Sequence, residues 1–436
     1  MSTVNDSVTR RGLLKRAGLS AATISAPMVL PSGLFGKAAP SNRITLGFIG
    51  MGGQGTGRNL GTFLNQPDIA VLAVCDVRRE AAENAKKKVD KNHQNSDCAA
   101  CQDFREVISR RDIDAIVIST PDHWHVPLAM AALRAGKDVF CEKPTLTITE
   151  GRKLVKEVAK RKAVFQWGIE DRSLIKYHRL CGWARSGAIG NVQSIHVSLP
   201  RKKPFLKDEP SPVPEGLDWN MWLGPAPFHP YTPTRTGPQN WRNITDYSGG
   251  SLTDWGSHLV DTAQICAGME NSGPVEVSGV AGKLDPETYQ SNAPVEYKVH
   301  YRYANGVDVY VEDAGPVDLR IVGTDGWVRC KGWDGVWEAS SQDIIRIKEF
   351  GKEANFWPRP QIEHRDFLDS MKSRKPPAYH VEAGQRLSTT LHLGHMALHT
   401  GRKIEWDPER EAFAGGETES MNSNIYNRPA RDWESA

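Results

Sequence analysis

Short apolar runs alternate with amphipathic segments through the first part of the chain. The runs cover residues 44–49, 69–77, 115–120, 138–141 and 163–168. Between them lie segments with helical periodicity, such as 126–135 and 149–160. Strands buried on both faces form continuous apolar runs, and intervening helices imply crossover connections. The pattern predicts a doubly wound α/β domain with a parallel sheet over residues 41–165.

The pattern changes after Gln166. A helical segment at 174–185 and a strand at 192–199 precede a stretch rich in Pro, Trp and Gly at 201–250. Alternating apolar and polar positions then predict strands at 275–279, 295–303, 308–312, 319–322 and 326–329. Helices are predicted at 361–372 and 383–398. Because few helices separate these strands, we predict an α+β domain at 166–408 with an open, mostly antiparallel sheet. Residues 409–436 are predicted to form a loosely packed polar tail.

Length and composition agree with this division. A chain of 436 residues accommodates two domains, and 39% hydrophobic with 25% charged residues is typical of a globular protein. The net charge of +3 is spread along the chain, so we expect neither nucleic acid nor a membrane surface as a partner. Seven cysteines exclude a complete disulfide framework. For the closely spaced Cys98 and Cys101, a disulfide or no bond is favoured over a metal site.

The N-terminal residues have the features of an export signal. Arg10 and Arg11 precede a weakly apolar segment that reaches about Leu30, which is too short and too polar to span a membrane. Small residues such as Ala38 and Ala39 provide a cleavage site. The pattern resembles a twin-arginine (Tat) signal, so we expect residues 1–40 to be removed on Tat export to the periplasm. No cysteine precedes Cys75, so we expect no lipid anchor; the alternative is a disordered basic arm.

A glycine-rich turn follows the first apolar run. Gly50, Gly52 and Gly55 fit the G-x-G-x-x-G pattern, and Gly53 and Gln54 lie between them. The first glycine permits a tight turn, the second lets the backbone approach a pyrophosphate, and the third permits close helix–strand packing. The helix that begins here offers unpaired N–H groups to phosphate. These five residues are therefore predicted to bind a dinucleotide.

An acidic residue ends the second apolar run. Asp76 lies twenty-one positions beyond Gly55 (76 − 55). An acid at this spacing hydrogen-bonds the ribose hydroxyls and repels a 2′-phosphate, which favours NAD over NADP. Arg78 keeps NADP as the less favoured alternative.

Three further segments connect the chain with a known family. They are Ser-Thr-Pro-Asp-His-Trp-His at 119–125, Cys-Glu-Lys-Pro at 141–144 and the segment 249–261, with Asp254 and His258 four residues apart. Together they resemble the glucose–fructose oxidoreductase/inositol dehydrogenase (Gfo/Idh/MocA) family over residues 42–406. The resemblance implies a Rossmann domain, an α+β domain whose open sheet serves oligomerisation, and a homodimer or homotetramer. It also implies hydride exchange between a nicotinamide and a sugar or polyol carbon.

The resemblance assigns roles to specific residues. Lys143 matches the active-site lysine, and Asp254 and His258 match the Asp-x-x-x-His pair. Chemistry supports these roles, because His258 titrates near working pH and suits a general base. Asp254 lies one helical turn earlier and shares its face, and Lys143 follows a parallel strand, where it can polarise the reacting oxygen. Thr120, His125 and Glu142 are expected beside the cofactor.

Several side chains have open interpretations. Asp261 either orients His258 or acts as a cap or solvent-facing residue. Two groups contain histidines that could ligate a metal. They are Asp122, His123 and His125, and His392, His395 and His399. Metal ligation is disfavoured for both groups, so we expect no metal. Aromatic faces stack on sugars but also fill cores, and arginines bind hydroxyls or carboxylates but also cover surfaces. Both interpretations apply to Trp219, Trp222, Trp241, Trp255, Arg172 and Arg242. The candidate substrate contacts among them are Trp241, Arg172 and Arg242.

Export restricts the possible reactions. An exported enzyme meets no NAD pool, so we expect a tightly bound cofactor and a sugar oxidation coupled to reduction of a second sugar. The alternative is a glycoside hydrolase or lyase that oxidises its sugar transiently. Glycosidases of this fold depart from the Glu-Lys-Pro pattern, so Lys143 favours the oxidoreductase. A non-catalytic sugar-binding protein is a further alternative, disfavoured by the intact lysine, aspartate and histidine.

The export prediction is tested with the twin arginines. Replacing both Arg10 and Arg11 by lysine should leave the precursor in the cytoplasm, because the Tat machinery reads the guanidinium pair. Cell fractionation and immunoblotting measure the outcome. Unchanged delivery of the variant to the periplasm contradicts a Tat signal.

Overall fold

The computed structural model describes residues 43–333, 335–351, 354, 359–414 and 424–432. The expected signal peptide at 1–40 lies outside the described residues. Every candidate site residue named above lies within them. In the described part of the chain, no helix combines the length and apolar character that crossing a membrane requires.

The first domain is built on a six-stranded parallel sheet with the strand order β3-β2-β1-β4-β5-β6. Its strands are β1 (Ile44–Ile49), β2 (Ile69–Cys75), β3 (Ala99–Cys101), β4 (Ala115–Ile118), β5 (Asp138–Glu142) and β6 (Phe165–Gly168). The residues of β4, β5 and β6 are all buried, as the continuous apolar runs predict. The boundary expected at residue 165 falls on the first residue of β6.

Helices connect these strands. They are η4 (Gly53–Leu60), α2 (Gly61–Leu64), α3 (Arg79–His93), α4 (Phe104–Ile108), α5 (Asp122–Arg134) and α6 (Ile148–Arg161). A capping box begins α6, since Thr147 accepts from the Glu150 N–H and Glu150 accepts from the Thr147 N–H. The strand order reverses between β1 and β4, the place where open α/β sheets bind ligands.

The second domain contains a nine-stranded sheet with the order β13-β12-β11-β7-β10-β9-β8-β14-β15. Its strands are β7 (Val192–Ser198), β8 (Pro274–Gly282), β9 (Val295–Tyr303), β10 (Asp308–Glu312), β11 (Asp318–Gly323), β12 (Trp327–Lys331), β13 (Val336–Ala339), β14 (Ile404–Asp407) and β15 (Ala412–Phe413). The pair β7–β10 is parallel and the other neighbours are antiparallel. The predicted fold class, a Rossmann domain followed by a mostly antiparallel sheet domain, is confirmed.

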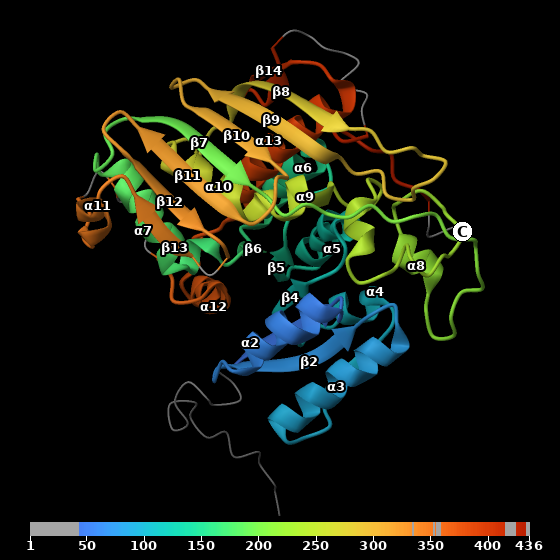
Figure 1. Cartoon of the computed structure of the whole chain (residues 1–436). Coiled ribbons are helices and arrows are strands. Elements are labelled where there is room, and N and C mark those ends of the chain that lie inside the picture. The colour runs from blue at the N-terminus through green and yellow to red at the C-terminus, as the bar shows by residue number, and fades with distance from the viewer. Residues whose placement is uncertain (1–42, 334, 352–353, 355–358, 415–423, 433–436) are drawn as a thin grey trace, which may run out of the picture. The chain divides into compact units, whose positions relative to one another are not determined.

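Helices cover one face of this sheet. The helical elements are η5 (Asp171–Ser173), α7 (Ile175–Arg185), α8 (Trp219–Leu223), η6 (Asn240–Asn243), α9 (Gly250–Asp254), α10 (Gly256–Cys266), α11 (Gln342–Arg346), α12 (Glu363–Ser373) and α13 (Val381–Thr400). Along β9, β10 and β11 buried positions alternate with more exposed ones. The buried face packs against α7, α10 and α13, as Figure 1 shows.

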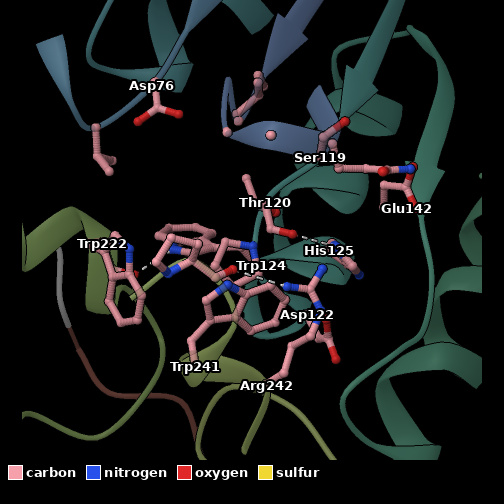
Figure 2. Close-up of a pocket in the computed structure, with 18 of the residues that line it drawn as sticks. Asp76, Ser119, Thr120, Asp122, Trp124, His125, Glu142, Trp222, Trp241 and Arg242 are labelled. Carbon is pink, nitrogen blue, oxygen red and sulfur yellow. Dashed lines mark hydrogen bonds between the residues drawn. The ribbon is translucent and has the colours of Figure 1, made fainter. Parts of the chain in front are cut away.

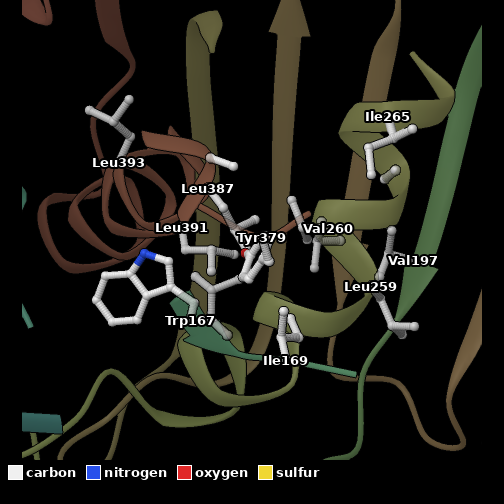
Figure 3. Packing of buried hydrophobic residues seen from close by; sticks show 14 of the residues in the cluster. Trp167, Ile169, Val197, Leu259, Val260, Ile265, Tyr379, Leu387, Leu391 and Leu393 are labelled. Carbon is white, nitrogen blue, oxygen red and sulfur yellow. The ribbon is translucent and has the colours of Figure 1, made fainter. Parts of the chain in front are cut away.

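The main core fixes the position of α10. Leu259 and Val260 of α10 belong to the same buried cluster as Trp167 of β6 and Leu391 of α13 (Figure 3). All four side chains are essentially removed from water. Because close-packed side chains leave little room for rotation, this core sets the direction of His258, which precedes Leu259.

A buried ion pair ties η5 to the same helix. Arg172 donates from Nε to Asp261 Oδ2 at 2.9 Å, from Nη2 to Asp261 Oδ1 at 2.7 Å and from Nη1 to the Ala378 carbonyl at 2.8 Å. This geometry corrects two expectations. Arg172 is positioned as a buried structural residue and not as a substrate contact, and Asp261 engages Arg172 and not His258.

Part of the expected polar tail is packed. The Tyr426 carbonyl accepts from the Thr149 N–H at the start of α6, 3.1 Å away. Arg431 donates to Oδ1 of Asn220 in α8 at 2.8 Å. Residues 424–432 therefore contact both domains, and the expectation of a loose tail does not hold for them.

Removing one partner of the buried pair should destabilise the fold. Asp261→Ala leaves the Arg172 guanidinium buried without its countercharge, which should cost about 3–5 kcal/mol of unfolding free energy. Urea denaturation followed by circular dichroism measures the loss. The double variant Arg172→Met with Asp261→Leu is the control, because it removes both charges and should recover most of the stability. Equal losses in both variants would contradict this account.

Candidate active site

A cavity of about 900 Å³ lies at the carboxyl ends of the parallel strands and receives residues from both domains. It is lined by predicted site residues from the glycine-rich turn, the strand ends and the second domain: Gly50, Gly52, Gly53, Gln54, Asp76, Thr120, His125, Glu142, Lys143, Trp241, Arg242, Asp254 and His258. Gly55 and Arg172 are not among its lining residues. Figure 2 shows Asp76 on one side of the cavity and Trp241 and Arg242 on the opposite side, with Thr120 and Trp124 between them.

The glycines of the turn have three different roles. Gly50 has a φ of +90°, and a Cβ there would lie 2.7 Å from the Ser119 backbone. A Cβ on Gly55 would lie 1.9 Å from the Gly50 carbonyl oxygen, so Gly55 permits the helix to approach the strand. Gly52 and Gly53 face open space, since a Cβ on either residue would have no neighbour within 4 Å. Their bare backbone therefore leaves room for a pyrophosphate, as the motif predicts.

Asp76 is held against this turn. Its Oδ2 accepts from the Met51 N–H at 2.7 Å and its Oδ1 accepts from the Arg78 N–H at 2.8 Å. Burial raises the pKa of Asp76, opposed by these two backbone hydrogen bonds. Each carboxylate oxygen keeps a lone pair beyond these bonds, so the group can also accept from ribose hydroxyls.

The loop after β4 connects the cofactor side to the catalytic side. His125 is buried, with Nε2 at 2.9 Å from the Thr120 carbonyl and Nδ1 at 2.8 Å from the Pro144 carbonyl. The ring therefore bridges this loop to the loop that carries Lys143. Thr120 Oγ1 is a buried polar atom without a hydrogen-bond partner in the described part of the chain. An unsatisfied hydroxyl in a cavity is costly, which fits a polar ligand beside it.

Glu142 binds the helix that follows the glycine-rich turn. Its Oε1 accepts from Gln54 Nε2 and from Asn59 Nδ2, both at 2.9 Å. The carboxylate thus connects the end of β5 to helix η4, which follows the glycine-rich turn. This arrangement couples the position of the neighbouring Lys143 to the cofactor-binding turn.

Lys143 and Asp254 form an ion pair between the two domains. Lys143 Nζ donates to Asp254 Oδ1 at 2.9 Å and to the Asp254 carbonyl at 2.8 Å. Burial alone lowers the pKa of Lys143, but the carboxylates of Asp254 and Glu142 outweigh burial and raise it. Burial raises the pKa of Asp254, but Lys143, Arg242 and Lys202 together hold it well below its usual range. Lys143 is therefore a cation and Asp254 an anion at neutral pH.

His258 has an acidic partner that sequence reasoning missed. Its Nδ1 lies 2.6 Å from Oδ2 of Asp171, which begins η5 just after β6. Burial alone lowers the pKa of His258, but the carboxylates of Asp171 and Glu170 outweigh both burial and the Lys143 ammonium, so the pKa is raised above its ordinary value. In the described part of the chain, Nε2 makes no hydrogen bond, and His258 lines the cavity. Asp171 follows a parallel strand, the position from which a catalytic partner could have been predicted.

Two further charged residues line the cavity: Lys202, which sequence reasoning missed, and Asp122, which it considered only as a metal ligand. Lys202 follows β7, and its Nζ lies 3.6 Å from Asp254 Oδ2. Asp122 begins α5 and accepts from Ser248 Oγ at 2.6 Å. Burial raises the pKa of Asp122 to about 7. Lys202 belongs to none of the motifs identified in the sequence, so only the folded chain brings it to the cavity, whereas Asp122 lies within the segment 119–125.

The histidines considered as metal ligands are buried in surroundings of their own. His123 Nε2 lies 3.0 Å from the Trp222 carbonyl, and burial lowers the pKa of His123 to about 3. Burial likewise lowers the pKa of His392 to about 4 and of His395 to about 3. Among the described residues, one group presents three possible ligand atoms within 4.8 Å of one another, namely Glu170, Asp171 and His258. Asp171 of this group is already engaged by His258. The absence of a metal remains a prediction.

The glycine-rich turn, the ribose-facing acid and the lysine–histidine end define a two-domain NAD(P)-binding oxidoreductase. The family model of the oxidoreductase NAD-binding Rossmann fold matches residues 44–169, and that of the C-terminal alpha/beta domain matches residues 201–435. The chain belongs to the Gfo/Idh/MocA oxidoreductase family.

Individual relatives are more distant. A glycosyl hydrolase family 109 protein from Saccharopolyspora erythraea is 35% identical over 141 residues, which are 31% of this chain and 30% of that protein. The chain thus matches about a third of the length of this curated relative. The WlbA dehydrogenase from Bordetella pertussis, solved with NADH and UDP-GlcNAcA, is 16% identical, with a TM-score of 0.62 over 84% of this chain and 99% of that one. The aldose–aldose oxidoreductase from Caulobacter crescentus, solved with glycerol, is 17% identical, with a TM-score of 0.59 over 83% and 99%.

The His258–Asp171 pair should be visible in a titration. In Asp171→Asn the pKa of His258 should fall by about one to three units, because an opposite charge at this distance favours the protonated ring. NMR titration of ¹³C-labelled histidine measures the shift, and a His258→Gln sample assigns the signal. The buried His123 is the internal control and should not titrate near neutral pH. An unchanged His258 pKa would contradict the pairing.

Proposed function

We propose that the protein is an exported NAD-dependent oxidoreductase that transfers hydride between its nicotinamide cofactor and a sugar or polyol carbon. The observation that carries the proposal is the cavity itself. It places a dinucleotide cradle at one side and a lysine, a histidine and their carboxylate partners at the other. The family supports the reaction class, and the position of Asp76 supports NAD over NADP.

The residues present fit a dinucleotide. The open backbone at Gly52 and Gly53 suits the pyrophosphate, and Asp76 suits the adenosine ribose. The unsatisfied Thr120 hydroxyl and the end of β4 suit the nicotinamide half. When bound, the cofactor supplies the hydride acceptor or donor, and the remaining chemistry falls to the protein side chains.

Lys143 orients and polarises the reacting oxygen. Its ammonium has three N–H donors, of which two point at Asp254. In the described part of the chain the third N–H is not engaged, so it can donate to a sugar oxygen in the cavity. As negative charge develops on that oxygen, the cation at this position stabilises it more than it stabilises the neutral alcohol.

His258 carries the proton. Its neutral Nε2 accepts the hydroxyl proton during oxidation, and the imidazolium returns it during reduction. Asp171 fixes the ring through Nδ1 and stabilises the imidazolium that forms. Asp254 stays ionised beside Lys143, so it orients the lysine and accepts from a sugar hydroxyl.

A closed redox cycle follows from the expected export. Without a nucleotide pool, the cofactor must stay bound while one sugar is oxidised and another reduced. Slow cofactor release requires tight binding, and nanomolar affinity at a typical association rate corresponds to residence of minutes or longer. The solved aldose–aldose oxidoreductase of the same fold supports a sugar-to-sugar reaction.

The experiment is a single-enzyme redox cycle. Purified protein should release nearly stoichiometric NAD on denaturation. A donor sugar should raise the nicotinamide absorbance, and an acceptor sugar should reverse it. Lys143→Ala should keep the fold and the nucleotide but lose turnover by on the order of 10²-fold. Lys203→Ala, an exposed neighbour of Lys202, is the matched control and should behave as the wild type.

Three results would contradict the proposal. One is protein that purifies empty and turns over only with millimolar added NAD, which indicates an ordinary dehydrogenase. Another is released nucleotide that is solely NADP, which overturns the role of Asp76. The third is near-normal turnover in Lys143→Ala, which moves the chemistry to other residues.

A second candidate is glycosidic bond cleavage through transient sugar oxidation. The similarity to a glycosyl hydrolase family 109 protein favours it. Such an enzyme cleaves aryl glycosides with no net change in nicotinamide absorbance. It also exchanges solvent deuterium into the carbon next to the oxidised centre. The same protein preparation, mixed with aryl glycosides in D₂O, separates the two candidates.

A further inference from the structure

The substrate end of the cavity contains more positive than negative charge around one carboxylate. Asp254 receives Lys143 at 2.9 Å on Oδ1, and Lys202 at 3.6 Å and Arg242 at 3.4 Å on Oδ2. All four side chains line the cavity and are between 11% and 21% exposed. One carboxylate neutralises one of the three cations, which leaves an excess of two positive charges.

The neighbouring carboxylates do not remove this excess. Glu142 accepts from Gln54 and Asn59 on the cofactor side, and Asp171 pairs with His258. Glu170 also lines the cavity, and its Oε2 lies 3.8 Å from Nη2 of Arg58. Asp122 accepts from Ser248 and, with a pKa of about 7, carries at most part of a charge near neutral pH. Among the described residues, Asp254 is the acid whose carboxylate lies within 4.0 Å of the Lys202 ammonium, and the same carboxylate lies within 4.0 Å of the Arg242 guanidinium. Partly buried cations without a countercharge are costly, so an anionic ligand would stabilise this arrangement.

The guanidinium of Arg242 is also held in an orientation that suits the binding of an anion. Its guanidinium carbon lies 4.2 Å from the centre of the Trp241 ring, so the planar group packs over the aromatic face. Figure 2 shows Trp241 and Arg242 together at the side of the cavity opposite Asp76. This packing restricts the guanidinium, whose Nη1 donates to the Pro238 carbonyl at 3.4 Å. In the described part of the chain Nη2 makes no hydrogen bond, so it can donate to a carboxylate or phosphate. The pyrophosphate of a dinucleotide belongs at the glycine-rich turn and does not supply this anion.

We propose that the sugar bound here carries an acidic group, and that Lys202 and Arg242 bind it while Lys143 and His258 act on a hydroxyl of the same molecule. The inference rests on the proposed function and names the class of substrate for that site. A carboxylate, as in a uronic acid, and a phosphate ester share this chemistry. Neutral sugars of the same configuration should react poorly.

The test compares matched sugars that differ in one group. Glucose, glucuronate and glucose 6-phosphate form one set, and galactose and galacturonate form another. The nucleotide-loaded full-length protein should show a kcat/KM at least about 10-fold higher for an acidic sugar than for its neutral counterpart. The uronate and phosphate arms identify which anion is preferred.

Variants locate the preference. Lys202→Gln and Arg242→Gln should each lower kcat/KM for the preferred acidic sugar by about 10- to 100-fold, mainly through KM, and change the neutral sugar far less. Arg242→Lys should recover part of the loss, because it restores the charge without the planar fork. Lys203→Gln, next to Lys202 but outside the cavity lining, is the matched control and should leave both rates unchanged.

The outcomes separate this inference from the proposed function. Equal losses for acidic and neutral sugars in Lys202→Gln and Arg242→Gln would mean that both residues only hold Asp254, and would overturn the inference. A neutral sugar that reacts as well as its acidic counterpart would also overturn it. If no sugar exchanges hydride, the proposed function fails. In that case, separate calorimetric titrations of the NAD-loaded protein with glucuronate and with glucose still measure whether the site binds the anion more tightly.

Discussion

The ion pair between Lys143 and Asp254 is the contact on which the site depends, because it joins the two domains at the reacting centre. Lys143 comes from the end of β5, and Asp254 comes from the last turn of α9. The lysine binds both the carboxylate and the backbone carbonyl of Asp254, so the contact fixes the end of the helix as well as a side chain. The paired charges keep a cation and an anion ionised in a mostly buried cavity.

The surrounding contacts hold this pair in place from both sides. On the cofactor side, Glu142 binds Gln54 and Asn59, and His125 bridges the Thr120 and Pro144 carbonyls. On the substrate side, the core beneath α10 directs His258, and the Arg172–Asp261 pair secures η5, which carries Asp171. Lys143 therefore lies on the loop after β5 and His258 lies on α10, and each is held by its own set of contacts. In the proposed reaction, this separation allows one group to polarise an oxygen while the other moves a proton.

The two carboxylate–cation pairs differ in the balance of charge. Asp171 faces a single histidine, and its effect is to favour the imidazolium. Asp254 faces three cations, which together hold its pKa well below the usual range. The side of Lys202 and Arg242 thus carries more positive than negative charge, which is the feature on which the proposed preference for an acidic sugar rests.

The sequence alone determined the elements and the residues that belong to local motifs. Continuous apolar runs predicted the parallel strands, since burial on both faces demands them, and G-x-G-x-x-G marked a turn whose steric requirements are local. Asp76 lies at a fixed spacing from that turn, and the resemblance to a known family marked Lys143, Asp254 and His258. The tertiary structure decided the partners of these residues. Arg172 and Asp261 bind each other, Asp171 orients His258, and Lys202 reaches Asp254, because contacts between residues far apart in sequence depend on how the two sheets and their helices pack. No local spacing encodes that packing, and it alone brought three cations to one carboxylate.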